Sequence, residues 1–69
     1  MNIQPVQPHV DLKHGRYTLA RVKELTGISA NTIRKIRDNL FPLWKLEHAE
    51  DRHPYYTGSE VVAIWKMFW

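Results

Sequence analysis

The chain has 69 residues, no cysteine and a formal net charge of +3, from ten Lys or Arg residues against seven Asp or Glu residues. A chain of this length forms one small domain and leaves no room for a catalytic scaffold around a buried pocket. The absence of cysteine excludes disulfides and thiolate metal sites.

Residues 1–15 contain two of the four prolines and no sustained apolar period, so we predict a flexible N-terminal arm there. The folded domain is predicted at residues 16–69. The beginning of the chain lacks the basic and apolar regions of a signal peptide, and no apolar stretch approaches membrane-spanning length. We therefore expect a cytoplasmic protein without a membrane partner.

A first short helix is predicted from Thr18, as its N-cap, to about Thr26. The helix turns a stripe of apolar side chains toward the core, namely Leu19, Val22 and Leu25. Such a short helix needs a packing partner to persist.

A tight corner follows this helix within three residues. Gly27 can adopt the positive φ that ends a helix, and Ser29 can accept a hydrogen bond from the free amides of the next one. Pro42 disfavours helical geometry at the residue before it, so the second helix should end near Leu40. The pattern predicts two helices joined by a sharp turn, which is typical of a helix-turn-helix.

The second helix has an apolar and a cationic face. The apolar positions, spaced by three and four residues, are Ile33, Ile36 and Leu40. In a helix-turn-helix the second helix enters the DNA major groove with its N-terminal residues nearest the base edges. The candidate DNA-binding residues of this recognition helix are Ser29, Asn31, Thr32, Arg34, Lys35 and Arg37. The alternative is a solvated helix on a small domain.

Positive charge is concentrated around this unit. Residues 16–41 contain six Lys or Arg residues against two acids, a net charge of +4, whereas residues 42–69 carry −1. A polyanion-binding face requires such concentration, because released counterions supply much of the affinity for DNA. Arg16 and Arg21 can reach phosphates from the first helix, or they serve only its solubility.

Two short strands are predicted after the second helix, at residues 43–46 and 54–56, around a polar loop at residues 47–53. Together they would form a wing able to touch a DNA backbone or minor groove. The wing residues suited to this contact are Lys45, His48, Arg52 and His53. Three acids in the same stretch oppose the approach of phosphate, namely Glu47, Glu50 and Asp51.

A third helix is predicted after the capping-box sequence that runs from Thr57 to Glu60. Its apolar residues cover more than one face. We expect Trp44, Trp65 and Phe68 in the core, whereas the candidates for self-association on DNA are Val62, Met67 and Trp69. Trp69 packs back on the domain, meets another protein, or precedes further chain.

From Arg16 to Trp69 the sequence resembles the winged-helix DNA-binding domain of the MerR type, and especially its small relatives, the phage excisionases and AlpA-like regulators. The most specific matches are the Leu-Thr-Gly-Ile-Ser turn with the Thr-Ile-Arg that follows, and the start of the helix at 56–60. The resemblance implies three helices plus a two-stranded antiparallel wing, with Thr32 and Arg34 at double-stranded DNA. It also implies a role in site-specific recombination or promoter control for a mobile element, in a bacterial cell or phage-infected bacterium.

Other classes of function have weaker support. A winged helix can act as a protein-binding adaptor, and the apolar stretch from Trp65 to Trp69 would be its docking surface. The histidines and acids of the polar loop follow no known zinc spacing, so we expect no metal site. No nucleophile, base and orienting group stand at recognisable spacing, so we expect neither an enzyme nor a cofactor.

Overall fold

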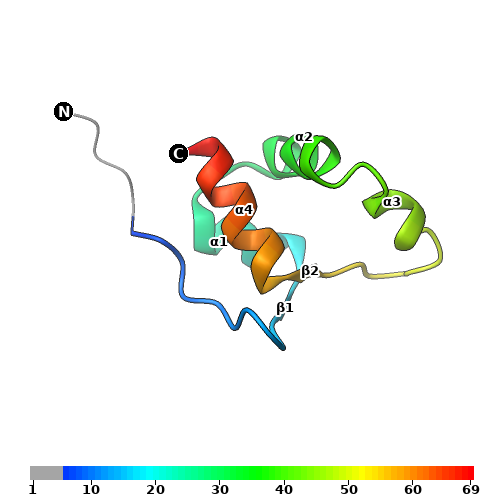
Figure 1. The fold of residues 1–69 in the computed structure, drawn as a ribbon, viewed down its shortest axis with the longest axis horizontal. Helices are drawn as coiled ribbons and strands as arrows, with labels where there is room; N and C mark the ends of the chain where they lie inside the picture. Colours follow the sequence, from blue (N-terminus) through cyan, green and yellow to red (C-terminus); the bar gives the residue numbers. More distant parts are fainter. Residues whose placement is uncertain (1–5) are drawn as a thin grey trace.

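The computed structural model describes residues 6–69, which form four helices and a two-stranded antiparallel sheet (Figure 1). In chain order the elements are β1 (Arg16–Tyr17), α1 (Leu19–Thr26), α2 (Ala30–Leu40), α3 (Trp44–Glu47), β2 (Tyr56–Thr57) and α4 (Gly58–Phe68). The predicted class, mainly helical with a small antiparallel sheet, is confirmed. The described residues contain one helix more than the three predicted, and none of the helices is long and apolar enough to span a bilayer.

The corner between α1 and α2 has the predicted caps. The Thr18 hydroxyl accepts a hydrogen bond from the Arg21 amide, and Gly27 ends α1 with a φ of 72°. The Ser29 hydroxyl accepts from the Thr32 amide and so begins α2. These local rules placed both helix boundaries correctly, because each cap satisfies backbone groups that the helix itself leaves free.

The strand predicted at residues 43–46 is wrong, because Leu43 precedes the short helix α3 as its N-cap and residues 44–46 belong to it. Its Leu, Lys and Glu residues favour a helical turn, and it contains no β-branched residue. One helical turn also brings Trp44 and His48 together at a spacing of four residues. Their rings stack with centroids 4.0 Å apart. Four residues are too few for a hydrophobic period to separate helix from strand.

The sheet pairs β2 with β1 and not with residues 43–46, so the predicted wing hairpin is absent from the described structure. Arg16 pairs with Thr57, and Tyr17 pairs with Tyr56. No strand was predicted at residues 16–17, because a strand of two residues is too short to show an alternating pattern. The described chain between α3 and β2 is therefore a loop at residues 48–55, not the connection of a β-hairpin.

The capping box at the start of α4 is present as predicted. The Thr57 hydroxyl accepts from the Glu60 amide, and the Glu60 carboxylate accepts from the Thr57 amide at 2.8 Å. Gly58 lies between them, where a Cβ atom would collide with the Asp11 carbonyl group. The N-terminal segment therefore runs directly against the beginning of α4.

Thr57→Ala should lower the free energy of unfolding by about 1 kcal/mol, because it removes the side-chain cap of α4. Chemical denaturation followed by circular dichroism measures this difference. Ser59→Ala is the matched control, since Ser59 is exposed in the same helical turn and caps nothing. Equal midpoints for the two variants would contradict the role of Thr57.

The core lies where α2 and α1 pack against α4. Its buried side chains are Val22, Ile28, Ile33, Trp44, Tyr56, Val61, Ile64 and Trp65. Val10 from the N-terminal segment packs against this cluster. The prediction for Trp44 and Trp65 is confirmed, but the prediction for Phe68 is wrong: its side chain is 45% exposed. Phe68 belongs to the last turn of α4, where its ring meets the Trp69 ring edge-on with centroids 4.9 Å apart.

Candidate functional site

The polar side chains at the start of α2 divide into those that cap the helix and those that face solvent. Ser29 donates its hydroxyl hydrogen to the Thr32 hydroxyl at 2.9 Å and caps the helix as well. Asn31, Arg34 and Lys35 are exposed. Since residues three and four apart lie on one face of a helix, these three side chains share a surface.

This surface carries unneutralised charge. Within residues 6–69, Arg34 and Lys35 take part in no ion pair, and the Asn31 side chain takes part in no hydrogen bond. The exposed face of α2 therefore presents hydrogen-bond donors that no acceptor within residues 6–69 satisfies. An arginine and a lysine in this state are suited to an anionic ligand.

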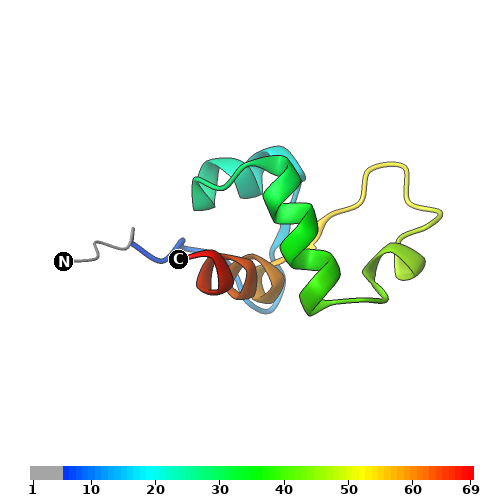
Figure 2. The same ribbon diagram turned by 90° about the horizontal axis from the view of Figure 1, so that it is seen from above.

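A shallow depression of about 360 Å³ brings α2 together with two other parts of the fold. Arg34 lines it from α2, and Arg52 and His53 line it from the loop between α3 and β2. Figure 2 shows this loop, in yellow, extending toward the side of the domain on which α2 begins. The lining contains two guanidinium groups and no carboxylate, so it favours anions.

The start of α1 forms the remaining wall of the depression, through Thr18, Leu19 and Ala20, and Pro54 completes the lining. The sequence pattern identified Thr18 only as a cap and did not place it at the candidate site. No local signal indicates this position, because the depression arises from the packing of three separate segments.

Two other candidate cations are paired on the surface. Arg21 contacts Glu24 at 2.9 Å, and Lys45 contacts Asp38 at 3.5 Å. Exposed pairs of this kind contribute at most about 1 kcal/mol. Both side chains therefore remain accessible, but their charge is partly offset by a neighbouring acid.

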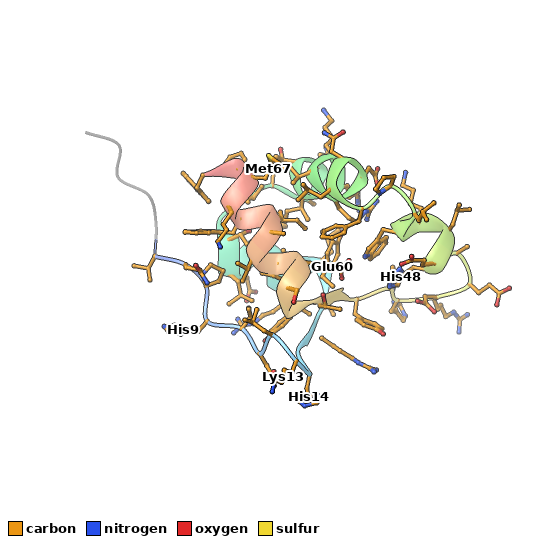
Figure 3. All side chains as sticks on the ribbon, in the orientation of Figure 1. His9, Lys13, His14, His48, Glu60 and Met67 are labelled. Atoms are coloured by element: carbon orange, nitrogen blue, oxygen red, sulfur yellow. The ribbon has the colours of Figure 1, made fainter. Side chains whose placement is uncertain are left out.

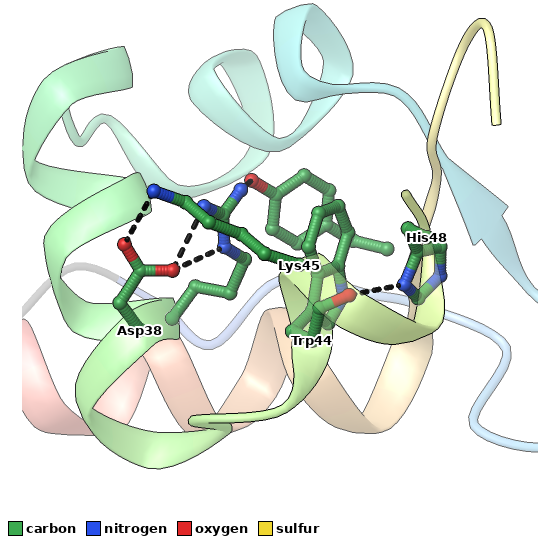
Figure 4. A network of polar contacts seen from close by, with 6 residues as sticks. Asp38, Trp44, Lys45 and His48 are labelled. Carbon is green, nitrogen blue, oxygen red and sulfur yellow. Dashed lines mark hydrogen bonds and ion pairs between the residues drawn. The ribbon is translucent and has the colours of Figure 1, made fainter. Parts of the chain in front are cut away.

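Arg37 requires a correction, because it was predicted on the outer cationic face and is buried instead, with 5% of its surface exposed. Its guanidinium donates to the Tyr56 hydroxyl at 2.9 Å and to the Asp38 carboxylate at 2.9 and 3.1 Å. It also lies over the Trp44 ring, 4.2 Å from the ring centroid. Figure 4 shows this network. Arg37 therefore holds the domain together and is not available to a ligand.

The same network acts on Asp38. Hydrogen bonding from Arg37, aided by the nearby charge of Lys45, holds the pKa of the Asp38 carboxyl below its usual range despite the opposing effect of burial. Asp38 is thus an anion that joins the buried guanidinium to the surface ammonium group (Figure 4).

His48 is used by the fold as well. Its Nδ1 lies 2.9 Å from the Trp44 carbonyl oxygen, which can only accept, so Nδ1 carries the hydrogen. The ring also stacks on Trp44 and meets Tyr55 edge-on. Among residues 6–69, no group of three or more His, Asp or Glu side chains is placed to hold a metal ion.

The apolar residues of α4 proposed for self-association differ in exposure. Val62 is half-buried, Met67 is 59% exposed and Trp69 is 41% exposed. Trp69 does pack back in part, since its indole N–H donates to the Thr26 carbonyl at 3.1 Å. Met67 and Phe68 therefore contribute most of the open apolar surface at this end of α4.

Fold and surface together define a small, mainly helical domain with an open cationic face formed by α2, the start of α1 and the loop before β2. Comparison with known proteins finds no matching family model, no matching curated protein and no matching solved structure.

Proposed function

We propose that this protein binds double-stranded DNA sequence-specifically, with α1 and α2 as a helix-turn-helix and α2 as its recognition helix. The observation that carries the proposal is the carboxylate-free depression in which Arg34 of α2 meets Arg52 and His53 of the following loop. The resemblance to MerR-type and excisionase-like domains supports the same reading of α2.

The arrangement supplies both kinds of contact that specific DNA binding needs. Asn31 and Arg34, exposed near the beginning of α2, have side chains able to pair with adenine and guanine edges in the major groove. Arg52 and His53 are suited to the phosphate backbone, which fixes the register of the helix on the duplex. Ser29 and Thr32 belong to the N-terminal end of α2, so both lie close to the DNA in this proposal.

In this proposal the loop at residues 48–55 makes the DNA contacts that were predicted for the wing. It reaches the depression through Arg52 and His53, although it contains no hairpin. Lys45 lies on α3 beside Asp38 and does not line the depression, so its contribution is secondary. Arg16 and Arg21 provide further exposed charge on the flanks.

The cellular role proposed with this activity is that of an excisionase-like recombination directionality factor, or a transcriptional regulator, of a mobile element in the bacterial cytoplasm. Both roles require occupation of more bases than one small domain contacts, so several copies would cooperate on one DNA. Met67 and Trp69, with Val62 at the margin, are the proposed contact between copies.

Arg34→Ala should weaken binding to the preferred DNA site by about 1–3 kcal/mol and relax base preference at one position, if the guanidinium holds a guanine edge. Selection of bound duplexes from a random pool, followed by fluorescence anisotropy, measures both effects. Lys66→Ala on α4 is the matched control, because it removes one exposed positive charge away from the depression. Equal affinity and preference in Arg34→Ala and the parent would refute the assignment.

A second candidate function, a protein-binding adaptor, is favoured by the exposed Met67 and Phe68. Titration of duplex DNA at two salt concentrations separates the two candidates. DNA binding through phosphates weakens steeply as salt rises. An affinity that does not change with salt concentration, or no binding to any duplex, would overturn the DNA proposal and favour the adaptor.

A further inference from the structure

A second depression, of about 450 Å³, lies beside the two-stranded sheet and is lined in part by Arg16 of β1 and Thr57 of β2. Its lining residues are Lys13, His14, Gly15, Arg16, Tyr55 and Thr57. Lys13 and His14 lie together at the lower edge of Figure 3, opposite the edge that carries Met67. The sequence pattern did not indicate either residue, because Asp11 cancels the charge of Lys13 in a simple count.

A tight turn fixes the backbone that carries Lys13 and His14. The Asp11 carboxylate accepts hydrogen bonds from the amides of Lys13 and His14, at 3.0 and 2.9 Å. The Asp11 carbonyl accepts from the Gly15 amide at 2.9 Å, and the Asp11 amide donates to the Tyr17 hydroxyl at 2.8 Å. Asp11 is therefore occupied with the backbone of its own turn, as is usual for this residue type.

The turn also depends on glycine. A Cβ atom at Gly15 would collide with the Asp11 carbonyl oxygen and the Tyr17 ring, so only glycine fits there. The backbone of the turn is thus held by β1 at one end and by its own hydrogen bonds at the other. Lys13 and His14 therefore start from a backbone of defined conformation. Residues 1–5 of the predicted N-terminal arm lie outside the described residues.

The side chains of Lys13, His14 and Arg16 in this depression are exposed to solvent. Among the described residues, those of Lys13 and His14 form no ion pair or hydrogen bond. The Arg16 guanidinium lies over the Tyr55 ring, 4.8 Å from its centroid. Stacking on an aromatic face orients an arginine but leaves its N–H groups free to bind an anion.

The two depressions are neighbours along the chain and in space. Arg16 lines the second and Thr18 the first, and residues two apart in extended backbone are separated by roughly 7 Å. On the facing segment, Tyr55 lines the second depression and the adjacent Pro54 lines the first. The same two segments, residues 13–20 and 52–57, therefore contribute to both depressions, with Lys13 and Arg16 in the second and Arg52 in the first.

We propose that the second depression binds a phosphodiester group of the same DNA duplex, so that the interface extends from α2 to the N-terminal turn. This inference rests on the proposed DNA binding. Ammonium and guanidinium groups at one open site suit a phosphate oxygen. The site is too open to hold a free phosphate ion tightly, and its affinity comes from release of counterions by a polyanion.

The test is the salt dependence of duplex binding by the full chain and by Lys13→Gln and Lys13→Glu. The slope of log K against log salt should fall by about 0.9 for each DNA phosphate that the variant no longer neutralises. Lys66→Gln is the matched control and should retain the parent slope. Circular dichroism and thermal melting confirm that each variant is folded, and inorganic phosphate serves as a competitor that should fail to displace the duplex at millimolar concentration.

The possible failures are distinct. If the parent binds DNA with a steep salt slope that both Lys13 variants retain, this inference is overturned and the proposed function stands. If the parent shows no salt-dependent binding to any duplex, both are overturned together. If inorganic phosphate alone displaces the duplex and shifts the NMR signals of His14 as strongly as DNA does, the depression is a small-anion site and not a site for the DNA backbone.

Discussion

Arg37→Ala is expected to lower the free energy of unfolding by about 2–4 kcal/mol, which is a large share of what a domain of this size possesses. The substitution removes charge-assisted hydrogen bonds to Tyr56 and Asp38. It also removes a buried guanidinium from the Trp44 ring and leaves its space unfilled. Urea denaturation followed by tryptophan fluorescence measures the decrease.

Two further variants identify its cause. Arg37→Lys keeps the charge but loses the planar fork, so it should remain clearly destabilised. Arg34→Ala, on the exposed face of the same helix, should have a free energy of unfolding within about 0.5 kcal/mol of that of the parent. An Arg37→Ala variant that is as stable as the parent but binds DNA less well would contradict the burial of Arg37 and would instead indicate a contact with DNA.

Ile33→Ala should lower the free energy of unfolding by about 2–5 kcal/mol, because it removes buried apolar surface and leaves a cavity in the core. Ile33 is fully buried at 0% exposure, where α2 packs on α1 and α4. In a domain of this size the decrease can be enough to abolish the folded state. Thermal melting by circular dichroism reports it directly.

Ile36→Ala provides the matched control on the same helix. Ile36 is only half-buried and packs at the edge of the core, so its truncation should cost less. The two melting temperatures should therefore separate, with Ile33→Ala the lower. Equal destabilisation, or an Ile33→Ala variant that melts with the parent, would show that the inner face of α2 is misplaced.

The helix boundaries were predictable because caps are local. Gly27, Ser29 and Thr57 each act on backbone groups within four residues, and all three have the predicted role. The pairing of β2 with β1 was not predictable, since it joins residues about 40 apart through two strands too short to show a pattern. The same limit applies to the depressions, which several segments build together.

Arg37 shows a different limit. It follows Ile33 by four residues, a spacing that predicts the inner face, whereas its charge predicts the outer face. The spacing was the better guide, because Trp44 and Tyr56 provide an aromatic and hydroxyl environment that accepts a guanidinium. Tyr56 lies 19 residues from Arg37 in the sequence, so its contact could not be read from a local pattern. Of the predicted site, the structure brings together Arg34, Arg52 and His53.

Tyr55 and Tyr56 are adjacent but serve opposite sides of the domain. Tyr56 is buried and accepts a hydrogen bond from Arg37, whereas Tyr55 supports Arg16 at the surface. A slip of one residue that brought Thr57 opposite Tyr17 would move Tyr56 from its buried position toward the surface position of Tyr55. It would place Thr57 where the Arg37 guanidinium needs the Tyr56 hydroxyl, and would take Thr57 from the α4 cap. So few strand hydrogen bonds cannot set this alignment by themselves, and the buried contact of Tyr56 with Arg37 and the cap formed by Thr57 both favour the observed register.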